Sequence, residues 1–293
     1  MRILSIDIGG TAIKTAITDE TGRIFSPAEF PSDGKLGGRL LMDRLFRIIE
    51  GYKVYDRIGI STAGQVDTKT GSIIFANDNI PGYTGTPVRS LTESRFHVPV
   101  AVGNDVNCAA LGEAHYGAGK EFSDFLCLTY GTGIGGGIVF NRKIYGGSRG
   151  VAGEFGHIMT HINGLSCVCG QQGCYEQYAS TTALVKQAMA VDPSLENGRL
   201  VFEAMRAGNK SINNVIDNWV EEIMLGLVIL VHIFNPPCMI LGGGIMNEDY
   251  ILQKINQKVY GKMMESYRNV VFKKAVLGNN AGLLGASFFV LQI

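Results

Sequence analysis

The sequence predicts an α/β fold made of two similar units, and three observations carry this prediction. Apolar segments with strand character alternate with segments of helical spacing, as where residues 58–60 follow residues 39–49. A hairpin with a glycine turn opens the chain, and a second one begins at Phe125. The two hairpin sequences align without a gap, with Gly9 on Gly131, which indicates an internal duplication. We therefore expect two α/β units that face each other across a cleft.

Length and composition are typical of a globular protein. The 293 residues suffice for two domains of ordinary size, and 46% of them are hydrophobic, which is ample for sizeable cores. Lys plus Arg equals Asp plus Glu at 26 each, so no global basic field would attract nucleic acid or an anionic membrane. The longest apolar run, residues 223–234, is interrupted by Gly226 and His232, and the N-terminus lacks the apolar region of a signal peptide. We expect no nucleic-acid partner, no membrane span and a cytoplasmic location, where all six cysteines would stay reduced.

The first glycine turn is a candidate phosphate site. Residues 2–6 alternate toward Asp7, Gly9-Gly10-Thr11 form the turn, and residues 13–17 restore a strand with Lys14 near its start. Adjacent glycines and a threonine expose N–H groups and a hydroxyl that can hold phosphate, and Asp7 beside them could bind Mg²⁺ directly or through water. A tight hairpin without a ligand explains the same residues, because Gly-Gly turns are common hairpin chemistry.

The second glycine turn satisfies the pattern G-x-G-x-x-G through Gly131, Gly133 and Gly136. A dinucleotide site of this type needs a helix after the glycines. Residues 137–145 are instead rich in β-branched and aromatic side chains, so the context argues against a Rossmann site for NAD. No G-x-x-x-x-G-K-[ST] motif occurs, which excludes a P-loop.

Two further strand ends carry candidate site residues. Residues 99–102 form a predicted strand that delivers Asn104 and Asp105 at its C-terminal end. Asp105 can serve as the N-cap of the helix that begins near Val106, a role that is compatible with catalysis. A buried strand at 238–241 ends in three glycines, which let a flat ligand approach the backbone, although a bare turn explains them as well.

Three cysteines and a histidine form the densest cluster of metal-binding residue types. Cys167, Cys169 and Cys174 lie within eight residues, and His157 stands ten residues before the first of them. One imidazole and three thiolates close a tetrahedral zinc site. Unrelated loop cysteines or a disulfide are the alternatives, but one thiol would remain unpaired. His161 competes with His157 as the fourth ligand, and spacing alone does not decide between them.

A closed zinc site positions other groups and leaves no coordination position for water, so a zinc hydrolase is disfavoured. The chemistry must then come from polar residues that the metal holds in place. Glu154 and Glu176 flank the liganding segment, and the second ring nitrogen of His157 is a further candidate.

Taken together, these motifs resemble those of the ROK family, named for repressors, open reading frames and kinases. The resemblance is carried, in the family's order, by D-I-G-G-T-A-I-K at 7–14, G-N-D-V-N at 103–107, G-T-G-I-G-G-G at 131–137, E-F-G-H at 154–157, C-V-C-G-Q-Q-G-C-Y-E at 167–176 and G-G-G at 242–244. The family's common Pro-Gly after the fourth strand reads Ala63-Gly64 here. Repressor members carry an N-terminal helix-turn-helix, whereas this chain starts at the phosphate hairpin, so it resembles the kinase branch.

The resemblance implies a two-domain actin-like ATPase (ribonuclease H-like) fold with an interdomain cleft. It implies a smaller N-terminal domain at residues 1–117, completed by a C-terminal helix at 281–293, and a larger domain at 118–280 that holds the zinc-binding loop. It also makes His157 rather than His161 the fourth zinc ligand, and it implies a homodimer.

In function, the resemblance implies an ATP-dependent hexose kinase that phosphorylates the C6 hydroxyl of an aldohexose. Glucose is the first candidate substrate, followed by N-acetylmannosamine, another N-acetylhexosamine, a β-glucoside and fructose. A regulator that senses sugar without turnover is the alternative from another class, and the intact Asp105 argues against it. The implied cofactors are ATP, Mg²⁺ and structural Zn²⁺.

The resemblance also assigns site residues. Asp105 is the implied catalytic base. The implied sugar-binding residues are Gly64, Asn104, Asp105, Glu154, His157 and Glu176. The implied nucleotide-binding residues are Asp7, Gly9, Gly10, Thr11, Lys14, Gly131, Thr132, Gly133, Gly242, Gly243 and Gly244. The implied zinc ligands are His157, Cys167, Cys169 and Cys174.

Overall fold

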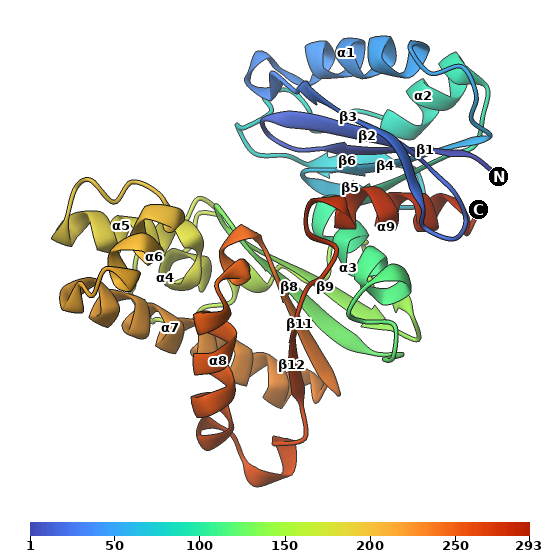
Figure 1. The fold of residues 1–293 in the computed structure, drawn as a ribbon. Coiled ribbons are helices and arrows are strands. Elements are labelled where there is room, and N and C mark those ends of the chain that lie inside the picture. Colours follow the sequence, from blue (N-terminus) through green and yellow to red (C-terminus); the bar gives the residue numbers. More distant parts are fainter. The chain divides into compact units, whose positions relative to one another are not determined.

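The computed structural model describes residues 1–293, which form two compact units (Figure 1). Unit 1 comprises residues 1–123, 138–152 and 279–293, and unit 2 comprises residues 124–137 and 153–278. These units are compact groups of residues and need not coincide with domains. The expected division into domains at 1–117 with 281–293, and 118–280, therefore stays a prediction.

The first five-stranded sheet has the order β3-β2-β1-β4-β7. Its strands are β1 (Ile3–Ile8), β2 (Ala12–Thr18), β3 (Ile24–Pro31), β4 (Arg57–Thr62) and β7 (Val100–Asn104). β1 pairs antiparallel with β2 and parallel with β4. β1 is buried almost throughout, because helices cover both faces of the sheet (Figure 1).

The second sheet repeats this plan with the order β10-β9-β8-β11-β12. Its strands are β8 (Phe125–Tyr130), β9 (Ile134–Phe140), β10 (Lys143–Ile144), β11 (Cys238–Gly242) and β12 (Val271–Lys274). In the alignment of Gly9 with Gly131, the ends of β1 and β8 coincide, and so do the starts of β2 and β9. The predicted duplication is therefore confirmed at the level of sheet order and hairpin length.

The nine α-helices are α1 (Gly38–Glu50), α2 (Val88–Phe96), α3 (Asp105–Tyr116), α4 (Glu176–Ala179), α5 (Thr181–Val191), α6 (Gly198–Arg206), α7 (Lys210–Phe234), α8 (Asp249–Lys258) and α9 (Ala281–Val290). The sequence predicts the helices α1, α3 and α9, at residues 39–49, from Val106 and at 281–293. It misses α2, β12 and the small hairpin of β5 (Gln65–Asp67) and β6 (Ser72–Phe75). None of the helices combines the length and the apolar character that crossing a bilayer requires.

The last helix, α9, belongs to the core of unit 1. Thr18 on β2 donates a hydrogen bond of 2.8 Å to Ser287, and Thr18 also shares one of 2.7 Å with Ser5 on β1. Gly285 lets α9 approach α3 closely, since a Cβ there would lie 1.6 Å from the Cys108 carbonyl oxygen. The C-terminal segment thus completes a unit that the first strands begin.

Candidate active site

Asp7 lies near the end of β1, where the sheet brings two polar residues beside it. The strand register pairs Asp7 with Ser61 on β4 and with Lys14 on β2. Ser61 Oγ donates a hydrogen bond of 2.6 Å to Asp7 Oδ1. Burial raises the pKa of Asp7, against the lowering effects of that hydrogen bond and of Lys14. Sequence reasoning missed this role of Ser61, although its position at the end of the neighbouring parallel strand was a usable signal.

The turn between β1 and β2 is held by a single buried serine. Ser32 Oγ donates to the Gly10 carbonyl at 2.8 Å, and Ser32 N–H donates to the Thr11 carbonyl at 3.0 Å. Gly9 N–H closes the hairpin by donating to Ala12 at 2.9 Å. The predicted phosphate turn is therefore fixed in shape by the residue that follows β3.

Asn104 caps α3, and the expected N-cap role of Asp105 is wrong. Asn104 Oδ1 accepts hydrogen bonds of 3.1 Å from the N–H groups of Val106 and Asn107. Its Nδ2 donates to Asp105 Oδ1 at 2.8 Å and to the Gly64 carbonyl at 2.9 Å. Asn104 has the extended backbone that an N-cap needs, whereas Asp105 is already the first helical residue. Capping therefore falls to the amide of Asn104.

Asp105 has the electrostatic environment of a general base. Burial and the nearby charge of Asp7 raise the pKa of Asp105 to about 6, although hydrogen bonds from Val106 N–H and Asn104 oppose the shift. A carboxylate with this pKa is ionised at neutral pH yet accepts a proton more readily than an ordinary aspartate. Gly64 lies beside this pair with a φ of 95°, so the glycine of Ala63-Gly64 is needed even though the family's proline is absent.

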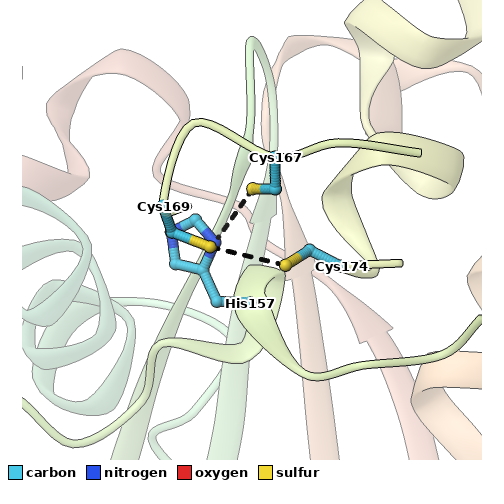
Figure 2. A group of neighbouring side chains, drawn as sticks. All are labelled: His157, Cys167, Cys169 and Cys174. Atoms are coloured by element: carbon cyan, nitrogen blue, oxygen red, sulfur yellow. Dashed lines mark hydrogen bonds between the residues drawn. The ribbon is translucent and has the colours of Figure 1, made fainter. Parts of the chain in front are cut away.

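In unit 2, His157, Cys167, Cys169 and Cys174 converge, as predicted for a metal site (Figure 2). Their four ligand atoms all lie within 4.8 Å of one another. His157 Nδ1 lies 3.5 Å from Cys167 Sγ, and Cys169 Sγ lies 3.5 Å from Cys174 Sγ. In a tetrahedral site with Zn–S bonds of about 2.3 Å, neighbouring sulfur atoms lie about 3.8 Å apart. The four residues therefore fit a zinc ion.

The structure places His161 outside this cluster. Its ring stacks on Tyr178 with centroids 3.8 Å apart, and Nδ1 shares a hydrogen bond of 3.0 Å with Thr160. Its Nε2 lies 3.6 Å from a carboxylate oxygen of Glu222. His157 is thus the histidine of the cluster, as the resemblance implies, and its Nδ1 faces the thiols while Nε2 is left for another partner.

Glu176 links the metal cluster to the second glycine turn. Its Oε1 lies 3.4 Å from Cys167 Sγ and 3.8 Å from His157 Nδ1. Its Oε2 accepts a hydrogen bond of 3.4 Å from Ile134 N–H at the start of β9. A Cβ at Gly133 would lie 2.5 Å from that same oxygen, so the turn and the carboxylate are in direct contact. Glu154, which precedes the short 3₁₀ helix Phe155–His157, is exposed.

A pocket in unit 2 adjoins the predicted nucleotide residues. It has a volume of about 760 Å³. Gly131, Thr132 and Gly244 line it, together with residues of α5, α6 and their connection. The sequence did not predict the lining residues from the helices and their connection, which are Thr181, Thr182, Val185, Lys186, Met189, Glu196, Asn197 and Gly198. Gly243 turns the chain at the end of β11 with a φ of 98°, which a glycine adopts without strain.

The two five-stranded sheets have the same strand arrangement, and each contains a hairpin with a glycine turn. This architecture is that of the two-domain actin-like ATPase class of α/β proteins. The chain belongs to the ROK family, whose model matches residues 3–293, and it falls among the sugar kinases of that family. The predicted fold class and family are both confirmed.

The relatives span the whole chain. A glucokinase of Streptomyces coelicolor is 35% identical over 97% of this chain and 96% of its own length. A beta-glucoside kinase of Listeria monocytogenes is 33% identical over 100% of this chain and 98% of its own. The crystal structure of a ROK family glucokinase from Streptomyces griseus in complex with glucose and AMPPNP is 33% identical, with a TM-score of 0.86 and full coverage of both chains.

Proposed function

We propose that this protein transfers the γ-phosphoryl group of ATP to the C6 hydroxyl of a hexose, and that the hexose is glucose. The observation that carries the proposal is Asp105, a carboxylate held by Asn104 at the start of α3 with a pKa of about 6. As the sugar oxygen bonds to the γ-phosphorus, its proton passes to Asp105, and the bond from phosphorus to the bridging oxygen breaks. ADP leaves with that oxygen.

Sugar recognition falls to residues that present hydrogen-bonding groups. Asn104 and Gly64 are joined by a hydrogen bond and lie beside Asp105. In unit 2, Glu154, Glu176 and Nε2 of His157 would receive or donate hydrogen bonds to sugar hydroxyls. Glu176, whose side chain is the less exposed of these two carboxylates, would discriminate against analogues that lack a hydroxyl, because its acceptors would be left unpaired.

The glycine turns and the unit 2 pocket are the proposed nucleotide-binding elements. Gly9, Gly10, Thr11 and Lys14 would hold phosphate oxygens in unit 1. In unit 2 the corresponding groups are Gly131, Thr132, Gly133 and the Gly242–Gly244 turn. Asp7 fits Mg²⁺, because a divalent cation offsets the cost of burying its carboxylate, and the ion supplies charge neutralisation at the phosphates when bound.

The cysteine and histidine cluster is a proposed structural zinc site. Four protein ligands complete a tetrahedral ion, so the metal orients residues and leaves no open position for substrate. Glu176 contacts two of the liganding side chains and therefore depends on the loop for its orientation. We further propose a homodimer in the cytoplasm, as the resemblance to the family implies.

Glucose is favoured because several full-length relatives are glucokinases. The test is a panel of glucose, N-acetylmannosamine, N-acetylglucosamine, a β-glucoside and fructose, with ATP consumption read as kcat/KM for each sugar. Glucose should give the highest value. A protein that binds hexose yet consumes no ATP with any of them would be a sugar sensor, and the proposal would fail.

A further inference from the structure

Unit 1 carries a second pocket that the proposed reaction does not use. It has a volume of about 490 Å³ and lies at the C-terminal end of α1, against the end of β3. Apolar and aromatic residues supply part of the lining and two arginines another part. The lining residues are Phe30, Pro31, Arg44, Arg47, Ile48, Gly51 and Tyr52.

The two arginines differ in what they already bind. Arg44 Nη1 donates to the Pro31 carbonyl at 2.6 Å and pairs with Asp33 at 2.5 Å. Arg47, three residues further along the same helix, is exposed, and its guanidinium group makes no hydrogen bond or ion pair. Residues three apart on a helix lie on one face, so both guanidinium groups can reach a single anion. Arg47 also lies near the C-terminus of the helix, where the partial negative charge offsets part of the positive potential that Arg47 offers to an anion.

The two aromatic lining residues, Phe30 and Tyr52, are held in place by contacts within unit 1. Tyr52 and Thr15 on β2 share a hydrogen bond of 2.7 Å between their hydroxyl groups. Phe30 packs against the core of unit 1 from β3. The nearby carboxylate of Glu50 is engaged by Arg95 at 2.6 Å, so it does not compete for Arg47. Asp33 is the acidic group that an incoming anion must displace or share.

We propose that this pocket binds a phosphomonoester that carries a ring, with the phosphate on Arg44 and Arg47 and the ring beside Phe30 and Tyr52. A ligand that carries a carboxylate would gain little, because at Arg44 it would replace the carboxylate of Asp33 with another carboxylate. A phosphate dianion offers three oxygen atoms to two guanidinium groups and forms bidentate pairs with them. The volume accommodates a sugar phosphate or a nucleoside monophosphate, two sources of the same chemistry.

The experiment places a reporter in the pocket itself. Trp219 is the only tryptophan and is fully buried in unit 2, so Phe30→Trp adds a fluorophore that responds locally. Glucose 6-phosphate, adenosine monophosphate and inorganic phosphate are titrated separately. Each titration is run with the proposed kinase site filled by glucose and a non-hydrolysable ATP analogue. One of the two esters should shift the tryptophan emission saturably, and should bind at least ten-fold more tightly than inorganic phosphate.

Charge removal at Arg47 is the specific control. In the Phe30→Trp background, Arg47→Gln should weaken ester binding about ten-fold or more, whereas Arg39→Gln on the same helix outside the pocket should leave it unchanged. Calorimetry on the wild type and on Arg47→Gln alone repeats the comparison without the tryptophan. No saturable response to either ester, or equal binding with and without Arg47, would overturn the proposal. Kinase activity is a separate assay, so loss of one proposal leaves the other standing.

Discussion

Asp105 joins two properties that a general base requires, a raised pKa and a fixed orientation. The raised pKa comes from burial and from Asp7, and the orientation comes from the amide of Asn104. Asn104 is the residue that caps α3, because its Oδ1 accepts hydrogen bonds from the N–H groups of the first helical turn. One amide therefore serves both the helix and the proposed catalytic carboxylate.

Replacing Asp105 with Asn should lower kcat by about 10²-fold or more, the usual scale for losing a general base. Sugar affinity should stay within about an order of magnitude, because the shape of the side chain is kept. Steady-state kinetics and sugar titration measure the two effects. Asp43→Asn, on the exposed face of α1, is the matched control and should have wild-type kinetics. A variant that keeps most of its turnover would remove Asp105 from the mechanism.

The pH dependence of turnover should report the pKa of Asp105. The base acts only when ionised, and its pKa is raised to about 6 in the free protein, so kcat/KM for the sugar should be constant above that pH and fall with decreasing pH below it. The measurement is kcat/KM from pH 5 to 8, because this ratio reports the pKa of the free enzyme. An unchanged kcat/KM down to pH 5 would contradict the assignment.

Ser32 illustrates how one element holds another at the scale of strands and turns. It follows β3, yet it binds both carbonyl groups of the turn between β1 and β2. It is almost fully buried, at 1% exposure, so its hydroxyl has no water to replace that contact.

The substitution Ser32→Ala should raise the KM for ATP several-fold while the KM for sugar stays close to that of the wild type. The Gly10 carbonyl would lose its hydrogen bond from Ser32, at a cost of about 1 kcal/mol in the free energy of unfolding. Kinetics against each substrate and a denaturant titration test this. Ser90→Ala, on exposed α2, should change neither quantity. A rise in the sugar KM alone would show that the turn does not hold nucleotide.

The loop that carries Cys167, Cys169 and Cys174 should affect the binding of sugar more than the binding of nucleotide. Cys169→Ser removes one thiolate, so bound zinc should fall below one ion per chain, and Glu176 should lose its fixed orientation. Hexose affinity and phosphorylation should fall together. Binding of an ATP analogue should fall less than hexose binding, since Glu176 touches the second glycine turn but does not line the unit 2 pocket. Metal analysis and two separate titrations measure these quantities.

The neighbouring Val168, whose side chain is 88% exposed, provides the control. Val168→Ser should retain zinc and sugar binding. Wild-type protein without stoichiometric zinc, or a Cys169→Ser variant that loses ATP binding instead of sugar binding, would refute the assigned role of the loop.

At the scale of the whole molecule, the C-terminal segment of the chain packs in the same unit as the N-terminal strands. α9 comes from the last residues, yet it packs on β1, β4 and α3 within unit 1. Its side chains Leu283, Leu284 and Val290 are buried there. Unit 1 therefore lacks part of its core until the C-terminus has been synthesised.

Deleting residues 279–293 should prevent unit 1 from folding, because it removes three large apolar side chains and the Ser287 hydrogen bond from the core. Circular dichroism and limited proteolysis should show loss of protected structure in residues 1–123. Deleting only residues 292–293 should lower Tm slightly, since Arg57 keeps its hydrogen bond to the Val290 carbonyl. A cooperative transition at the wild-type Tm in the larger deletion would contradict this.

The sequence by itself determined the features that are local in the chain. Glycine turns between apolar strands, helical spacing and cysteines within eight residues carry their meaning in neighbouring positions, so the duplicated hairpins and the metal cluster were predictable. α2 and β12 were not predicted, and α2 has only two buried positions, Val88 and Thr92, to mark a core-facing side.

Only the tertiary structure decided the features that join distant residues. The pairing of Asp7 with Ser61 crosses 54 positions and depends on strand register. The choice of Asn104 over Asp105 as the cap was decided by which side chain reached the free N–H groups of α3. The second pocket exists because Tyr52 and Arg44 are fixed by partners on β2 and β3. Register and competition for hydrogen bonds are settled by packing, and packing is not local in sequence.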